Sequence, residues 1–161
     1  MIDETPKYNS VTVACYIVAL ANEKGLSINM TKLQKLLYIA YGTYLALKNA
    51  RLTNEHPQAW PYGPVFPTTR NKLLKRDLSL ISLLDSDLQK IKDDKDIKSL
   101  MDLVLNSFGN KTATTLTIWS HQSGSPWDRV SSQEGFTWGE IIPDEYIKEY
   151  FNSILIRNGA K

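Results

Sequence analysis

The chain has 161 residues, of which 42% are hydrophobic, so it can bury one core of its own without disulfides or metal ions. Its 19 basic and 17 acidic side chains give a net charge of +2, which excludes the strong positive field of a dedicated nucleic-acid binder. No apolar stretch approaches the roughly 20 residues that cross a bilayer, and the amino terminus is polar and acidic. We therefore expect a single cytoplasmic domain.

The first long apolar segment, residues 11–24, is apolar nearly all round, which predicts a central, buried helix. Ser10 is its expected N-cap and Gly25 its expected left-handed stop. Cys15 lies within it, and because it is the only cysteine it excludes an intrachain disulfide. No basic residue adjoins Cys15 in the sequence, so we expect a buried, unreactive thiol.

A second helix is predicted from just after Asn29 to about Asn49, because apolar residues recur there every three or four positions. Lys32 and Lys35 fall outside this apolar stripe. Gly42 lies in the helix interior, where glycine costs about 1 kcal/mol relative to alanine. Its presence there indicates close packing against another helix.

Helical periodicity disappears over residues 50–69. Four prolines surround large apolar side chains in this segment: Pro57, Pro61, Pro64 and Pro67 alternate with Trp60, Tyr62, Val65 and Phe66. Proline removes a backbone donor and keeps the preceding residue out of the helical region. The segment is therefore predicted to be a long extended connector, with room for a short β-hairpin.

Four more helices are predicted after the connector, over 68–75, 85–108, 112–121 and from Pro143 to about Leu155. The charged run at 92–96 indicates a turn or a solvated helix start, and the SGSPWD segment at 123–128 ends the third of these helices. The fold class is thus mainly α, a single-domain bundle of about six helices. We expect an N-terminal extension at 1–10, the domain at 11–156 and a tail at 157–161.

Catalytic and ligand-binding motifs are scarce. One cysteine and two distant histidines give no metal-ligand spacing, and isolated glycines give no phosphate-binding loop. Asp93, Asp94 and Asp96 alternate with lysines, which favours a solvated face over a cation site. His121 near Asp128 lacks a nucleophile or oxyanion motif, so we expect a hydrogen-bonded histidine at a helix end and no enzyme.

The densest basic cluster consists of Arg70, Lys72, Lys75 and Arg76. On a continuing helix, the last three would share one face at spacings of three and four. Such a face can contact phosphates, contact an acidic protein, or serve solubility alone. All three interpretations stay open.

The segment 60–67 combines aromatic side chains with stiff prolines, which give a large contact area at a small ordering cost, as in protein-binding hot spots. The same side chains can instead cover the helices as a lid on the core. Each interpretation can hold for one side of the segment.

Three blocks of sequence occur in an order that is typical of a known protein family. They are LQKLLYIAYG at 33–42, AWPYGPVFP at 59–67 and LTIWSHQSGSPWD at 116–128, followed by GEIIPDEYIKEYF at 139–151. In this arrangement the chain resembles the Panacea domain family, which includes SocA-like antitoxins and phage-associated GepA-like proteins. The resemblance spans about residues 13–151, nearly the whole chain.

The resemblance implies a mostly helical domain that neutralises a cognate toxin encoded beside it, by direct binding. For the SocA-like branch it further implies an adaptor that hands the toxin to an ATP-dependent protease. Small departures from the family pattern at Thr68, Thr69 and residues 118–120 concern the identity of the partner rather than the fold. No residues are left over for an added DNA-binding domain, so direct nucleic-acid binding is not expected.

The toxin-docking element is expected to be rigid and partly exposed. It comprises Trp60, Tyr62, Gly63, Pro64 and Val65, with His121, Pro126 and Trp127 supporting or flanking it. A stable interface buries about 1,600 Å² in total, more than one loop supplies, so helix faces must contribute. The basic face of Lys72, Lys75 and Arg76 is one candidate.

Three other functions compete with this hypothesis. One is a small hydrolase that uses His121 and Asp128, which would need a third group in a water-excluding pocket. Another is a nucleic-acid-binding regulator acting through residues 70–76, with steeply salt-dependent binding. The third is a phage or mobile-element accessory protein that binds a host factor other than a toxin. The antitoxin hypothesis requires no cofactor, small-molecule substrate or membrane.

Overall fold

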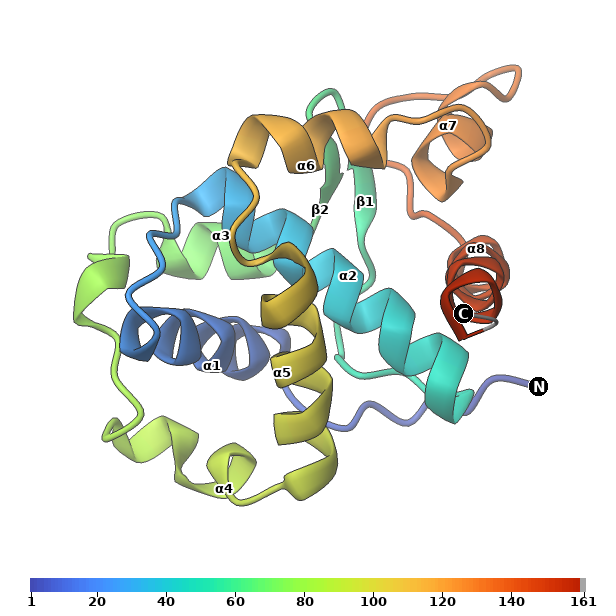
Figure 1. Ribbon diagram of the computed structural model, residues 1–161. Helices are drawn as coiled ribbons and strands as arrows, with labels where there is room; N and C mark the ends of the chain where they lie inside the picture. Colours follow the sequence, from blue (N-terminus) through green and yellow to red (C-terminus); the bar gives the residue numbers. More distant parts are fainter. Residues whose placement is uncertain (160–161) are drawn as a thin grey trace.

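Helix α2 forms the axis around which the other elements pack, as Figure 1 shows. The computed structural model describes residues 1–159. In chain order the elements are α1 (Ser10–Glu23), α2 (Met30–Lys48), β1 (Gln58–Trp60), β2 (Gly63–Val65), α3 (Pro67–Leu73), η1 (Leu78–Leu80), η2 (Ser86–Leu88), α4 (Gln89–Lys92), α5 (Lys95–Phe108), α6 (Ala113–Ser120), α7 (Pro126–Ser131) and α8 (Asp144–Gly159), η marking a 3-10 helix. The predicted fold class, a mainly helical bundle with a short hairpin in its connector, is confirmed.

The central position of α2 follows from its buried circumference. Every residue from Lys32 to Leu45 is buried, and the helix contacts α1, α5, α6, α8 and β2. The Asn29 side chain caps its amino end by accepting from the Lys32 backbone N–H, and Asn49 ends it in the left-handed conformation (φ 52°). The ends predicted from the sequence are therefore confirmed.

At Gly42, helix α2 leaves room for a side chain of α8. A Cβ at this position would overlap the ring of Phe151, which is itself buried and packs edge-on against Tyr38. The helix-packing prediction for Gly42 is thus confirmed. The cost of glycine in a helix is offset by the burial of an aromatic ring.

Helix α1 packs beside α2 and is buried from Val13 to Ala21, as the apolar run predicts. Its N-cap prediction was wrong by one residue. Asn9 caps the helix by accepting from the Val11 backbone N–H at 2.9 Å, while Ser10 is the first helical residue. Asparagine and serine cap equally well, so tertiary contacts decide between such neighbours.

The hairpin joins α2 to α3. β1 and β2 are antiparallel, with Trp60 opposite Gly63 and Gln58 opposite Val65. Gln34 of α2 fixes the hairpin to the bundle, because its amide accepts from the Phe66 backbone N–H at 2.7 Å and donates back to the Phe66 carbonyl. Ala59 and Phe66 are fully buried, so the inner side of the segment does cover the core.

The expected N-terminal extension is paired with the rest of the domain. The Asp3 backbone N–H donates to the Asn49 carbonyl and its carbonyl accepts from the Arg51 N–H, both at 2.9 Å, and Tyr8 donates its backbone N–H to the Leu52 carbonyl at 3.0 Å. The Tyr8 hydroxyl also donates to Asp94 at 2.8 Å. In Figure 1 the amino terminus accordingly lies near the end of α2.

Three helix predictions needed correction. The helix expected over 85–108 is interrupted, because Asp94 starts a new helix by accepting from the Ile97 backbone N–H, and η2 and α4 precede it. The helix expected over 68–75 ends at Leu73. Pro126 does not merely stop α6 but opens α7, with Ser125 as its N-cap. These changes raise the helix number from the expected six to eight α-helices within residues 1–159.

Helix α8 begins at Asp144, one residue after the expected Pro143, whose carbonyl accepts from the Ile147 backbone N–H. It runs to Gly159, through most of the expected tail at 157–161; Ala160 and Lys161 lie outside the described residues. Among the helices of residues 1–159, none is long and apolar enough to span a membrane.

Candidate partner-binding site

A hollow of about 310 Å³, which we call the hairpin pocket, lies between the outer side of the hairpin, the first turns of α2, and α3. It is lined by Met30, Thr31, Gln34, Lys35, Trp60, Tyr62, Val65, Arg70 and Leu74. Three of the residues expected to bind a partner, Trp60, Tyr62 and Val65, therefore meet in one place. The pocket also contains residues that the sequence did not single out, above all Lys35.

Trp60 forms the wall of the hairpin pocket. Its indole N–H donates to the Gln58 side chain at 3.0 Å, and the guanidinium of Arg70 lies over its ring, 5.6 Å from the centroid. The carbonyl of Trp60 accepts from the indole N–H of Trp127 at 2.8 Å. Tyr62, at the hairpin turn, is 74% exposed, so the rim is aromatic and open to solvent.

Gly63, Pro64 and Val65 are buried, whereas Trp60 is half-buried and Tyr62 is exposed, so only part of the element faces solvent. Gly63 has a φ of +112°, and a Cβ there would lie 2.7 Å from the Lys35 Cε and 2.7 Å from the Ser120 Oγ. Glycine is thus required for two reasons, its backbone conformation and the close approach of Lys35. Its role in the site is to make room.

Lys35 is buried, with 1% of its surface exposed, although its place in the sequence put it outside the apolar stripe. Its ammonium donates to the Pro64 carbonyl at 3.5 Å, a long hydrogen bond. No carboxylate of the described residues lies within 4 Å of it. Burial lowers the pKa of Lys35 from 10.5 to about 8.

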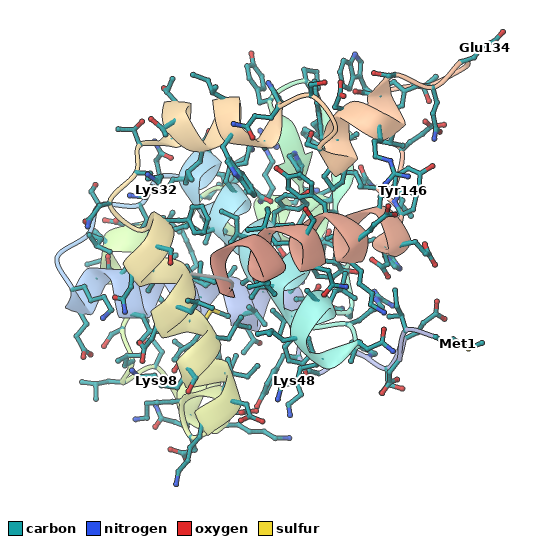
Figure 2. The ribbon with its side chains drawn as sticks, turned by 45° about the vertical axis from the view of Figure 1, so that its right-hand side comes forward. Met1, Lys32, Lys48, Lys98, Glu134 and Tyr146 are labelled. Atoms are coloured by element: carbon teal, nitrogen blue, oxygen red, sulfur yellow. The ribbon has the colours of Figure 1, made fainter. Side chains whose placement is uncertain are left out.

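Lys32, one turn earlier, is also buried, although it too lies outside the apolar stripe. Figure 2 shows it where the loop after α5 passes the start of α2. Its ammonium donates to the Gly109 carbonyl at 2.6 Å and to the Ser27 carbonyl at 3.4 Å. Burial lowers the pKa of Lys32, yet this lysine has a structural task, joining α2 to the end of α5.

His121, Pro126 and Trp127 lie behind the hairpin and support it. The rings of His121 and Trp127 stack with centroids 4.0 Å apart, and Trp127 in turn bonds to the Trp60 carbonyl. Pro126 is buried at the start of α7. These residues thus lie next to the hairpin, in the supporting position expected for them.

His121 does not form the catalytic pair considered from the sequence. The Asp128 carboxylate accepts from the Gly124 backbone N–H at 2.9 Å, and the His121 Nε2 is buried without a hydrogen-bond partner. This corrects the expectation of a hydrogen-bonded side chain. Burial lowers the pKa of His121, and the positive charge of Lys35 lowers it further.

Lys72, Lys75 and Arg76 do not share one helix face as expected, because α3 ends at Leu73, although all three are exposed. The guanidinium of Arg76 reaches toward Asp85 and α1. It lies 3.9 Å from the Asp85 carboxylate and 3.7 Å from the Cys15 sulfur. Cys15 is buried, as expected, and has Arg76 as a basic neighbour in space, although burial still raises the pKa of its thiol.

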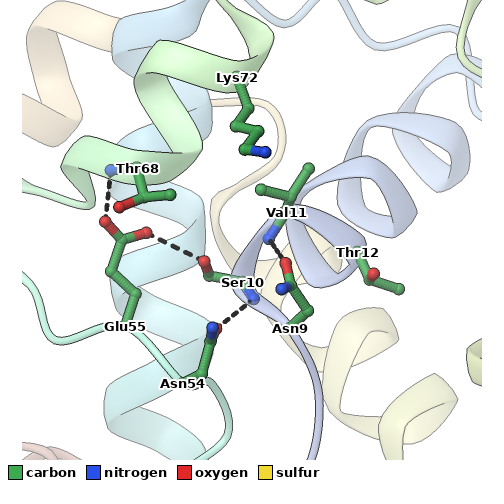
Figure 3. Close-up of a pocket in the computed structure, with 8 residues that line it drawn as sticks. All are labelled: Asn9, Ser10, Val11, Thr12, Asn54, Glu55, Thr68 and Lys72. Atoms are coloured by element: carbon green, nitrogen blue, oxygen red, sulfur yellow. Dashed lines mark hydrogen bonds between the residues drawn. The ribbon is translucent and has the colours of Figure 1, made fainter.

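A second hollow, of about 360 Å³, is structural (Figure 3). Its carboxylate, Glu55, accepts from the backbone N–H groups of Thr68 and Thr69 and from the Ser10 hydroxyl. Helix α3 has no side-chain cap of its own, and Glu55 takes that place. The carboxylate of this hollow is thus used in joining α1, α3 and the connector.

The acidic run of the sequence also has a structural use. Asp94 caps α5 and accepts from the Tyr8 hydroxyl, and Lys7 lies 3.5 Å from the same carboxylate. Within residues 1–159, no three His, Cys, Asp or Glu side chains gather into a group that could hold a metal ion.

The family profile described as "Antitoxin SocA-like, Panacea domain" matches residues 33–128, which contain α2, the hairpin, α6 and the start of α7. The chain belongs to this family. Antitoxin SocA of Caulobacter vibrioides (strain NA1000 / CB15N) is 32% identical over 154 residues, which cover 86% of this chain and 80% of that protein. No solved structure gives a significant match. The three blocks at 33–42, 59–67 and 116–128 all fall inside the matched region, and in the structure they meet at the hairpin.

Proposed function

We propose that this protein is an antitoxin that neutralises a cognate toxin by binding it directly, through a surface centred on the hairpin pocket. Membership of the SocA-like Panacea family supports the antitoxin role. The observation that carries the location is that two of the family-matched blocks, 33–42 and 59–67, line one hollow with an aromatic, exposed rim, while the third is bonded to the hairpin through Trp127. Aromatic side chains beside a pocket are typical anchors of protein interfaces.

The surface around the hairpin pocket offers further contact area. Trp138 is 54% exposed and stacks on Trp127, which is bonded to the hairpin, and Ile141 is 52% exposed and adjoins Gln58 of β1. Together with Tyr62 these side chains place apolar area along the hairpin. An interface of about 1,600 Å² needs more area than this, which helix faces must supply. The helix nearest to the hairpin in the sequence is α3, which carries the exposed Lys72.

A growth assay tests this proposal. The small gene adjacent to the one for this protein is expressed alone in a bacterial host, then together with this protein, and the two products are co-purified. Rescue of growth with a stable complex is the expected result. Rescue with disappearance of the partner would instead indicate delivery to an ATP-dependent protease, and a harmless neighbour would favour a host-factor binder over an antitoxin.

A matched pair of variants tests the location. Tyr62→Ala removes an exposed ring at the hairpin, and Leu84→Ala removes an equally exposed side chain (85%) in the loop between η1 and η2. Rescue should be lost or weakened by the first and unchanged by the second. Equal rescue by both variants would move the toxin-binding surface away from the hairpin.

A further inference from the structure

We propose that the hairpin pocket binds an acidic side chain of the partner protein, with Lys35 and Arg70 as its counter-charges. The inference rests on the proposed function, because it specifies the chemistry by which the same surface recognises its partner. It goes further in naming a single carboxylate as the group that the pocket takes.

The charge balance of the pocket is the first argument. Two cations and no carboxylate are among its nine lining residues. Lys35 is buried and makes one long hydrogen bond, to the Pro64 carbonyl, although an ammonium has three donors. A buried charge without a partner is costly, and such groups concentrate at binding sites. A carboxylate supplies both the missing charge and the missing acceptors.

The way the chain holds Lys35 in place is the second argument. Gly63 leaves space for the lysine stem where any side chain would collide with it. Gln34, next to Lys35 on α2, makes two hydrogen bonds with the backbone of Phe66, the residue after Val65. Arg70 is held over the Trp60 ring. The pocket is therefore formed before the partner arrives, which lowers the cost of binding.

The size and lining of the pocket favour a protein side chain over nucleic acid. A phosphate backbone is bound by many dispersed cations, whereas this pocket holds one buried lysine and one arginine within about 310 Å³. Trp60, Val65 and Leu74 give it an apolar wall that suits the methylene groups of a glutamate or aspartate. The neighbouring Arg76 does not line the pocket, and its guanidinium lies 3.9 Å from the Asp85 carboxylate.

The first test uses a small probe and does not depend on the toxin. The free protein is titrated with N-acetylglutamate N-methylamide and, as a neutral control, with the glutamine analogue, while NMR follows the Lys35 Cε and the Trp60 indole N–H. Saturating shifts at both positions with the glutamate probe alone are expected. Lys35→Met should abolish them and Lys90→Met, at an exposed lysine of α4, should leave them unchanged.

The pH dependence of the same titration gives a second reading. The charged and titratable groups around Lys35 are Arg70 of α3 and Tyr62 of the hairpin turn, which line the same pocket, and His121 at the end of α6, whose pKa is lowered by burial. Binding should therefore weaken as the pH rises past about 8, the pKa of Lys35. Equal shifts with both probes, shifts that persist in Lys35→Met, or no shift up to the solubility limit would each overturn the inference.

The second test uses the growth assay with Lys35→Met. Lost rescue by a folded variant supports the carboxylate site, while full rescue overturns it and leaves the antitoxin proposal standing. If the natural chain itself fails to rescue growth, the antitoxin proposal fails, and the probe titration alone decides whether the pocket takes a carboxylate.

Discussion

The two buried lysines of α2 make a matched comparison, since they have the same chemistry, lie one turn apart, and face different parts of the molecule. Lys32 faces the end of α5 and donates to two carbonyls, one of them at 2.6 Å. Lys35 faces the hairpin and has one carbonyl at 3.5 Å. The chain thus satisfies the first ammonium internally and leaves the second short of partners.

This difference separates a structural charge from one that is available for binding. Burial disfavours both ammonium groups, as the lowered pKa of each lysine shows. A hydrogen bond that joins two helices compensates for that burial at Lys32, whereas nothing in residues 1–159 compensates equally at Lys35. A buried charge that lowers the stability of the free protein is typical of a site that a partner completes.

The largest expected effect on stability comes from removing a core side chain of α2. Leu36 lies beside Lys35 on α2 and is fully buried, so Leu36→Ala should lower the free energy of unfolding by about 2 to 5 kcal/mol. Denaturant unfolding measures this value. A change below about 1 kcal/mol would mean that the core around α2 is looser than described.

Lys35→Met should stabilise the free protein at neutral pH. Each pKa unit corresponds to about 1.4 kcal/mol, so the fall of the Lys35 pKa from 10.5 to about 8 corresponds to a penalty of roughly 3 kcal/mol that methionine does not carry. Denaturant unfolding at about pH 7 should show most of this gain. A less stable variant would make Lys35 a structural residue and break the contrast with Lys32.

The same substitution predicts a change in pH dependence. Because the folded state lowers this pKa, the unfolded chain binds more protons between about pH 8 and 10.5, and the stability of the natural chain should rise through that window. The difference in stability between Lys35→Met and the natural chain should therefore shrink as the pH rises from about 7 to about 10. A constant difference would assign the gain to packing alone.

Lys32→Met should act in the opposite direction. It leaves the Gly109 carbonyl without its charged donor, and the loss of such a bond costs about 1 to 3 kcal/mol. Thermal or denaturant unfolding of the two lysine variants side by side gives the sharpest form of the comparison. Stabilisation by both would show that internal hydrogen bonds do not distinguish these residues.

The smallest effect on stability is expected for Tyr62→Ala, since its ring is 74% exposed and surface substitutions usually stay within about 0.5 kcal/mol. Its melting temperature should match that of the natural chain while growth rescue falls. A collapsed melt would show instead that the hairpin turn is needed for folding.

The sequence predicted most of the helical bundle, because apolar periodicity, asparagine caps and proline positions are local signals. It missed α7, since Pro126 reads equally well as a helix stop and as a first helical residue. It misplaced the end of α3, and with it the basic face of Lys72, Lys75 and Arg76, because nothing local marks Leu73 as the last helical residue.

The candidate site was visible from the sequence only in part. Trp60 and Tyr62 stood out by their aromatic, proline-rich surroundings, and they do line the pocket. Lys35 did not, because periodicity treats every lysine as solvent-facing, while its burial depends on a hairpin nearly 30 residues further along the chain. Gly63 was the available signal, since a glycine between two prolines and aromatics marks a close approach without naming what approaches.

The contact between Gly42 and Phe151 also bears on the synthesis of the protein. These residues are 109 positions apart (151 − 42), so at ordinary translation rates the groove in α2 emerges on the order of 5 to 20 s before the ring that fills it. During this interval the nascent chain leaves uncovered the face of α2 on which α8 packs in the folded protein. A message cut short before α8 therefore yields a chain that cannot close its core, which makes the supply of folded protein dependent on intact, full-length translation.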